Sequence, residues 1–134
     1  MTSPVLSLRI TDRLRLAGAT LTTVQGISAV MSRVQDGYDR RDAAALAALH
    51  SHDCVVDSPI AGVHVGRAAI ERTLRTVFSA FPDLRIRKED LLVAGNRAVW
   101  TLTIEGTDTG GFMGLPPTGK PFRLSALFMF TFGN

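Results

Sequence analysis

EGTDTGGFMGLPPTGKPF, residues 105–122, separates two long segments in which apolar and polar residues alternate. Glycine adopts backbone angles that a Cβ forbids, and proline fixes φ and removes an amide donor. The five glycines and the adjacent prolines of this stretch therefore favour a shaped connection between two strands over a helix. A loop of this length inside one domain is uncommon and is usually either functional or disordered. Phe112, Met113 and Leu115 argue against disorder, because a solvated loop does not need three large apolar side chains.

The segments on both sides of the loop have the period of two that is typical of half-buried strands. Apolar residues alternate through residues 98–104 before the loop and through residues 122–132 after it. Upstream, Gly95-Asn96 is a two-residue hairpin signal, and the polar interruption Lys88-Glu89-Asp90 fits a β-bulge. The C-terminal half of the chain thus predicts long antiparallel strands.

Three earlier stretches have helical periodicity instead. The first carries one apolar stripe, formed by Ile27, Val30, Met31, Val34 and Tyr38. Asp42 is a good N-cap for an alanine-rich second helix over residues 43–50. Gly66 leads into the third helix and Pro82 ends it, with an apolar face formed by Ile70, Leu74, Val77, Phe78 and Phe81. Helices followed by antiparallel strands predict an α+β fold, with the helices on one side of a curved sheet.

The composition is that of one globular domain. The chain has 134 residues, 46% of them apolar, which is enough for one core. Its net charge of +3 comes from arginines spread along the sequence rather than from a basic cluster, so we expect no nucleic-acid partner. Cys54 is the single cysteine and excludes an intrachain disulfide. We see neither a secretory signal nor the ~20 apolar residues of a membrane span, and we expect a cytoplasmic protein with no membrane contact.

The loop also resembles that of a known family. Residues 106–120 fit, without gaps, the pattern of the SnoaL-like polyketide cyclases, a branch of the NTF2-like superfamily, and the elements from about Ile27 to Phe132 follow the same order. The resemblance implies an α+β NTF2-like cone, in which three N-terminal helices and a curved, mostly antiparallel sheet enclose an apolar pocket. We expect residues 1–25 to be an N-terminal extension, residues 26–134 to form the domain, and the protein to be a homodimer.

The end of the sequence predicts a missing strand. Members of the family continue beyond residue 134 with a final strand that crosses the middle of the sheet. Without that strand, residues 122–132 would form an exposed aromatic edge, which is a site of aggregation. We expect either a longer natural chain or a substitute for the final strand, for which residues 5–10 and a partner subunit are the candidates.

The resemblance does not carry the family's chemistry to this chain. In these cyclases an aspartate on the last strand and a histidine on the strand after the loop promote an intramolecular aldol closure without a metal. Phe128 occupies the position of that histidine, and the position of the aspartate falls beyond Asn134. A phenyl ring cannot exchange protons, so the cyclase mechanism is not expected in its usual form.

Asp57 and His64 are the remaining catalytic candidates. Asp57 matches the position of the general base in related ketosteroid isomerases, and a carboxylate facing an apolar pocket is suited to removing a carbon-bound proton. The alternative is a turn residue that bonds its own backbone before Pro59. The resemblance places His64 at the mouth of the pocket, where it either pairs with Asp57 or lies in a hydrated loop.

The candidates for lining the pocket are large and mostly aromatic: Trp100, Phe112, Met113, Phe128 and Phe130. Residues of this kind at strand spacing more often form a plain core, although in a cone the core face and the pocket face are one surface. We expect no cofactor and no metal, since His50 and His52 point apart and have no third ligand near them. Gly114 and Gly119-Lys120 have phosphate-loop spacing, but Pro121 replaces the required serine or threonine. Asp108 stands where relatives often carry histidine.

The sequence therefore predicts a SnoaL-like domain that binds a hydrophobic, polyketide- or steroid-like small molecule. One hypothesis is a cofactor-independent cyclase or isomerase that transfers a proton next to a carbonyl. The alternative is a non-catalytic binding or accessory protein that associates through its sheet.

Overall fold

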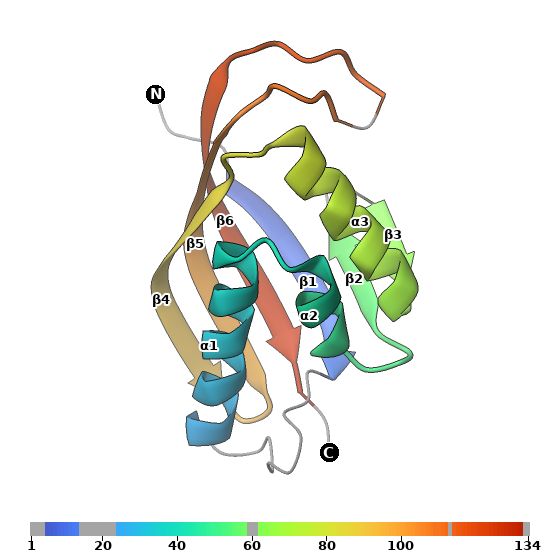
Figure 1. The fold of residues 1–134 in the computed structure, drawn as a ribbon. Coiled ribbons are helices and arrows are strands. Elements are labelled where there is room, and N and C mark those ends of the chain that lie inside the picture. The colour runs from blue at the N-terminus through green and yellow to red at the C-terminus, as the bar shows by residue number, and fades with distance from the viewer. Residues whose placement is uncertain (1–4, 14–23, 59–61, 113, 133–134) are drawn as a thin grey trace.

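The computed structural model describes residues 5–13, 24–58, 62–112 and 114–132, and it has helices on one face of a mixed sheet (Figure 1). Its elements are, in chain order, β1 (Val5–Arg13), α1 (Val24–Asp39), α2 (Ala43–Ala48), β2 (Val55–Ser58), β3 (Gly62–Val65), α3 (Arg67–Ala80), β4 (Arg85–Ala94), β5 (Arg97–Thr107) and β6 (Pro121–Thr131). Within these residues the sheet has six strands in the order β3-β2-β1-β6-β5-β4. This arrangement confirms the α+β prediction.

Local sequence signals account for the helices. The apolar stripe of α1 is buried, with Ile27, Val30 and Met31 at most 1% exposed, so the stripe faces the sheet. The carboxylate of Asp42 accepts a hydrogen bond from the amide of Ala45 at 3.0 Å and caps α2. The third helix, α3, ends at Ala80 shortly before Pro82, as the sequence predicts. No helix in the described part of the chain combines the length and the apolar character needed to cross a bilayer.

The three C-terminal strands form an antiparallel sheet whose register follows the alternation in the sequence. Ala94 pairs with Arg97 around the Gly95-Asn96 turn, which confirms the hairpin. The β4–β5 register shifts between Lys88 and Asp90, where the polar interruption predicts a bulge. The loop begins after Thr107 and returns at Pro121, and these two residues still pair with each other.

The N-terminal strand β1 lies inside the sheet, between β2 and β6. It pairs antiparallel with β2 and parallel with β6, and its register with β6 runs from Val5–Ser125 to Ile10–Phe130 before an irregularity. The aromatic strand β6 is therefore paired on both sides, by β5 and by β1. Residues 5–13 of the same chain thus pair with the edge of β6 that faces away from β5. Sequence analysis had assigned residues 1–25 to an N-terminal extension outside the domain.

The core lies between the helices and the sheet. Its largest fully buried side chains include Trp100 from β5, Phe130 from β6 and Phe132 just after β6. The first helix, α1, packs on β4 and on α2, and α2 packs on α3. Figure 1 shows that the β5–β6 loop extends beyond the sheet and passes over the end of α3. Helices, sheet and loop thus surround one region on three sides.

Candidate functional site

A cavity of about 460 Å³ lies between the helices, the inner face of the sheet and the β5–β6 loop. This volume is in the range of sites for small organic ligands. Most of its lining is apolar: Val34 and Leu46 from α1 and α2, Ile70, Leu74 and Val77 from α3, Ile86, Ile104, Leu124, Ala126, Phe128 and Phe130 from the sheet, and Phe112 and Leu115 from the loop. The cavity therefore lies beneath the glycine- and proline-rich loop, and its walls are largely apolar.

Two anchors hold the loop over the cavity. The carboxylate of Asp83 accepts hydrogen bonds from the amide and the hydroxyl of Thr107, both at 2.8 Å. These bonds, the hydroxyl's first, hold the pKa of Asp83 below its usual value. Farther along, the amide of Gly110 donates to the carbonyl of Ala80 at 2.9 Å and joins the loop to the end of α3.

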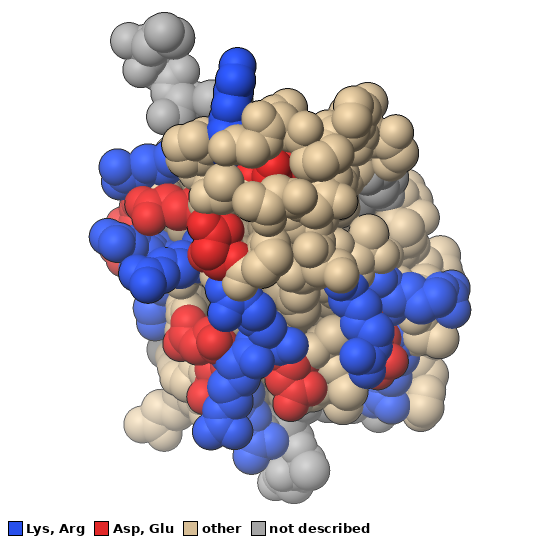
Figure 2. Space-filling model, turned by 45° about the horizontal axis from the view of Figure 1, so that its top comes forward, with Lys and Arg blue, Asp and Glu red and all other residues tan. Residues whose placement is uncertain are grey.

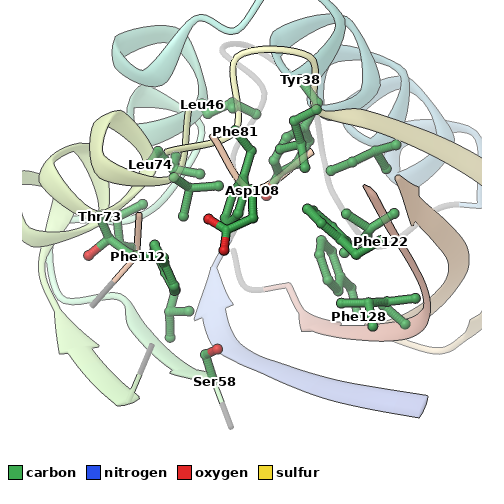
Figure 3. Close-up of a pocket in the computed structure, with 18 of the residues that line it drawn as sticks. Tyr38, Leu46, Ser58, Thr73, Leu74, Phe81, Asp108, Phe112, Phe122 and Phe128 are labelled. Atoms are coloured by element: carbon green, nitrogen blue, oxygen red, sulfur yellow. The ribbon is translucent and has the colours of Figure 1, made fainter. Parts of the chain in front are cut away.

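Aromatic contacts complete the loop end of the cavity. The ring of Phe81 lies 5.5 Å from that of Phe112 and 5.0 Å from that of Phe122, measured between centroids. All three rings line the cavity, and Figure 3 shows them around the carboxyl group of Asp108. Phe112, one of the apolar residues that argued against a disordered loop, thus packs over the cavity.

Three of the predicted lining residues reach the cavity and one does not. Phe112, Phe128 and Phe130 line it. Trp100 is fully buried behind this surface, with its ring 6.5 Å from that of Tyr38 and 5.8 Å from that of Phe128. The prediction for Met113 falls on a residue outside the described ranges.

The structure places Asp57 away from the cavity, which corrects the sequence-based prediction of its orientation. Side chains of a strand alternate between the two faces of the sheet. In β2, Val56 and Ser58 line the cavity, and Asp57 between them is exposed on the opposite face. Asp57 therefore has no contact with a molecule in the cavity, and the structure gives no geometric basis for its predicted role as a base.

His64 does line the cavity, as does His50, which the sequence had considered only as a metal ligand. His64 pairs with Val56 across β2 and β3, so both side chains lie on the inner face. His50 is 6% exposed, and its Nδ1 lies 2.8 Å from the carbonyl oxygen of Leu46. Since a carbonyl can only accept, Nδ1 carries the hydrogen. The described residues contain no cluster of three or more metal-binding side chains.

Tyr38 is a polar group of the cavity that sequence reasoning assigned only to the apolar stripe of α1. Its ring contacts Phe78, Trp100 and Phe128, at centroid distances of 6.2–6.5 Å. Burial raises the pKa of Tyr38 to about 12, because the phenolate loses its hydration there. The hydroxyl is therefore protonated at neutral pH and can donate a hydrogen bond to a ligand.

Asp108 also lines the cavity, and sequence analysis had left its role open. It is the only carboxylate among the described residues that line the cavity. Its Oδ2 accepts hydrogen bonds from the amide and the hydroxyl of Thr118, at 3.1 and 3.0 Å. The signal in the sequence that could have identified this site was the aspartate at position 108, where relatives often carry histidine.

The surface around the loop is mostly uncharged, in contrast to the rest of the same face. In Figure 2, basic and acidic side chains alternate over the strands and α3, and few of either kind lie around the loop. The excess positive charge therefore does not gather at the cavity. An apolar ligand approaching the loop meets little charge.

Fold and cavity together define an NTF2-like α+β cone, and sequence comparison assigns the family. The family described as SnoaL-like polyketide cyclase matches residues 28–134, and the chain belongs to it. No curated protein is significantly similar to the chain in sequence.

Solved structures with the same fold are distant in sequence. TsrD from Streptomyces laurentii superposes with a TM-score of 0.71 at 22% identity, over 84% of this chain and 82% of that protein. A candidate polyketide cyclase from Pseudomonas putida has a TM-score of 0.64 at 23% identity, over 87% and 84%. A ketosteroid isomerase-like protein from Erwinia carotovora atroseptica has a TM-score of 0.53 at 15% identity, over 81% and 95%. These similarities establish the fold.

Proposed function

We propose that the protein binds a polyketide- or steroid-like small molecule in its cavity and catalyses a cofactor-independent cyclisation or isomerisation of it. The observation that supports this most strongly is the apolar cavity of about 460 Å³ beneath the loop. The few polar side chains that line the cavity can form hydrogen bonds in defined directions. In apolar binding sites such groups orient the ligand. The family of the chain makes the polyketide class the first choice.

The reaction begins with the removal of a proton from the carbon next to a carbonyl. His64 is the base in this proposal, since it lines the cavity and imidazole is the commonest general base. The hydroxyl of Tyr38 donates a hydrogen bond to the enolate oxygen, and it stays protonated because its pKa is about 12. In a ring closure, the enolate carbon attacks a second carbonyl, one carbon–carbon bond forms, and the alkoxide takes back the proton from His64.

The test combines a binding measurement with a turnover measurement. A ligand present at a hundred times its dissociation constant stabilises the folded state by about 2.7 kcal/mol, which a thermal unfolding curve detects. We expect His64→Gln to abolish turnover of a polyketide substrate while this stabilisation remains. His52→Gln is the matched control, because His52 is exposed and does not line the cavity. If no polyketide- or steroid-like compound shifts the unfolding curve, the proposal fails.

A non-catalytic binding protein is the second candidate. Phe128 favours it, because this ring stands where the family's histidine is expected and its packing against Trp100 and Tyr38 keeps that part of the cavity apolar. This candidate predicts ligand-induced stabilisation without turnover, and no effect of His64→Gln beyond a change in affinity.

The proposal extends to a homodimer that forms through the outer face of the sheet. Val99 and Met129 pair across β5 and β6 and are only partly buried, as is Leu127. These side chains lie on the face opposite Trp100 and Phe128, which point to the core. Light scattering on wild type and on Met129→Glu distinguishes a dimer from a monomer. The cytoplasmic location stays a prediction from the sequence.

A further inference from the structure

One oxygen of the Asp108 carboxylate is buried but has no hydrogen-bond partner among the residues that the structure describes. The other oxygen, Oδ2, is occupied by two donors from Thr118, whereas Oδ1 has none. Leaving a buried acceptor unpaired is unfavourable, and more so for a charged group. We propose that Oδ1 of Asp108 accepts a hydrogen bond from a hydroxyl group of the ligand, so that the cavity selects hydroxylated apolar molecules. This inference rests on the proposed function and specifies the ligand.

The position of this oxygen is fixed by the backbone around it. The amide of Asp108 donates to the carbonyl of Lys120 at 3.0 Å, and the carbonyl of Asp108 accepts from the amide of Gly119 at 2.7 Å. With the two bonds from Thr118, these contacts hold both arms of the loop together at Asp108. The carboxylate is therefore preorganised and cannot turn Oδ1 toward another partner without losing existing bonds.

The surroundings of Asp108 favour a neutral hydroxyl over a charged donor. Figure 3 shows the carboxyl group of Asp108 directed into the space between Phe112 and Phe122, beside Phe81. An ammonium ion would lose its hydration among these rings, which is costly, whereas a hydroxyl has much less hydration to lose. The ligand therefore carries its hydroxyl at the loop end, with its apolar skeleton farther inside.

The test uses a hydroxyanthracene, its O-methyl ether and unsubstituted anthracene as probes, each titrated by fluorescence. The methyl ether keeps the oxygen as a hydrogen-bond acceptor but has no O–H donor. Unsubstituted anthracene reports the binding of the ring system alone. Since a hydrogen bond to a charged group is stronger than a neutral one, we expect wild type to bind the hydroxyl compound about tenfold or more tightly than the ether.

Asp108→Asn should reverse or abolish this preference. The two Thr118 donors require an acceptor, so the amide oxygen of asparagine takes the place of Oδ2 and its NH₂ group replaces Oδ1. The variant then presents a donor where wild type presents an acceptor. Asp57→Asn is the matched control, because it makes the same chemical change at a residue that is exposed on the opposite face of the sheet and does not line the cavity. It should keep the wild-type preference.

The outcomes separate the two proposals. Equal binding of the hydroxyl compound and the ether by wild type, or an unchanged preference in Asp108→Asn, overturns the role of Asp108 and leaves the proposed binding function intact. Failure of wild type to bind any of the three probes or any polyketide overturns both. The comparison of probes on wild type needs no variant, so it does not depend on the folding of Asp108→Asn.

Discussion

Tyr38 offers a direct test of the apolar cavity, because it is the only tyrosine in the chain. The ultraviolet absorbance of tyrosinate therefore reports the ionisation of this one hydroxyl in the intact protein. Burial raises its pKa to about 12, whereas an unfolded tyrosine titrates at about 10. We expect the absorbance of the folded protein to titrate near the higher value and that of the denatured protein near the lower one.

The same difference predicts a loss of stability at high pH. The folded state disfavours the phenolate, so the unfolded state releases its proton first as the pH rises. The stabilisation is complete below about pH 10 and is lost as the pH rises to about 12. A difference between about 10 and about 12 corresponds to about 2.7 kcal/mol. The variant Tyr38→Phe has no proton to lose and should not show this decline.

The measurement is the difference in unfolding free energy between wild type and Tyr38→Phe at several pH values. All the other titratable groups are common to both proteins, so their contributions cancel in the difference. We expect this difference to shift by about 2 kcal/mol against wild type between pH 10 and pH 12, out of a complete change of about 2.7 kcal/mol. A constant difference, or a folded-state midpoint near 10, would refute the placement of the hydroxyl in an apolar enclosure.

Two further predictions concern the loop. Gly110→Ala should destabilise the protein by about 1–3 kcal/mol and weaken ligand-induced stabilisation, because its Cβ would lie 2.7 Å from the carbonyl oxygen of Ser79 and 2.8 Å from the Cα of Ala80. Gly114→Ala is the control, because an added Cβ there meets no atom within 4 Å and the substitution tests only the strain of a positive φ. Equal losses of thermal stability in the two variants would contradict the clash at Gly110. Asp83→Asn should lose less stability in acid than wild type does. The pKa of Asp83 is lower in the folded protein than in the unfolded chain, so its carboxylate stabilises the fold above the unfolded pKa. This stabilisation disappears as the pH falls through the folded pKa. An acid titration of both proteins checks this, and identical curves would contradict it.

Local sequence signals were sufficient for most of the fold. The stripe of α1, the cap at Asp42 and the Gly95-Asn96 turn each depend on residues within a few positions of one another. The family resemblance supplied what these signals could not, namely that helices and sheet enclose a cavity. The place of β1 could not be derived, because its pairing with β6 joins segments more than 100 residues apart and weak alternation does not specify a partner.

The site was predicted less well, and the reasons are geometric. The strand β2 has only four residues, and its two valines put an apolar residue on each face, so the sequence does not reveal that Asp57 points outward. Trp100 and Phe128 are directly paired across β5 and β6, yet only Phe128 reaches the cavity, while Tyr38 from α1 packs against Trp100. Whether a residue on the inner face of the sheet is covered by a helix depends on where that helix packs. The alternation of residues along a strand does not contain this information.

The distribution of polar groups in the cavity constrains the ligand more than its volume does. Phe128 packs against Tyr38 and Phe130, so the inner face of β6 is apolar where the family's histidine is expected. The polar side chains that line the cavity come from other elements, among them Asp108 from the loop, Ser58 and His64 from β2 and β3, and Tyr38, His50 and Thr73 from the helical side. A ligand that matches this pattern has an apolar middle and oxygen substituents at its periphery. An apolar group at the loop end would leave the buried Oδ1 of Asp108 without a hydrogen bond, and a penalty of this kind makes such sites selective.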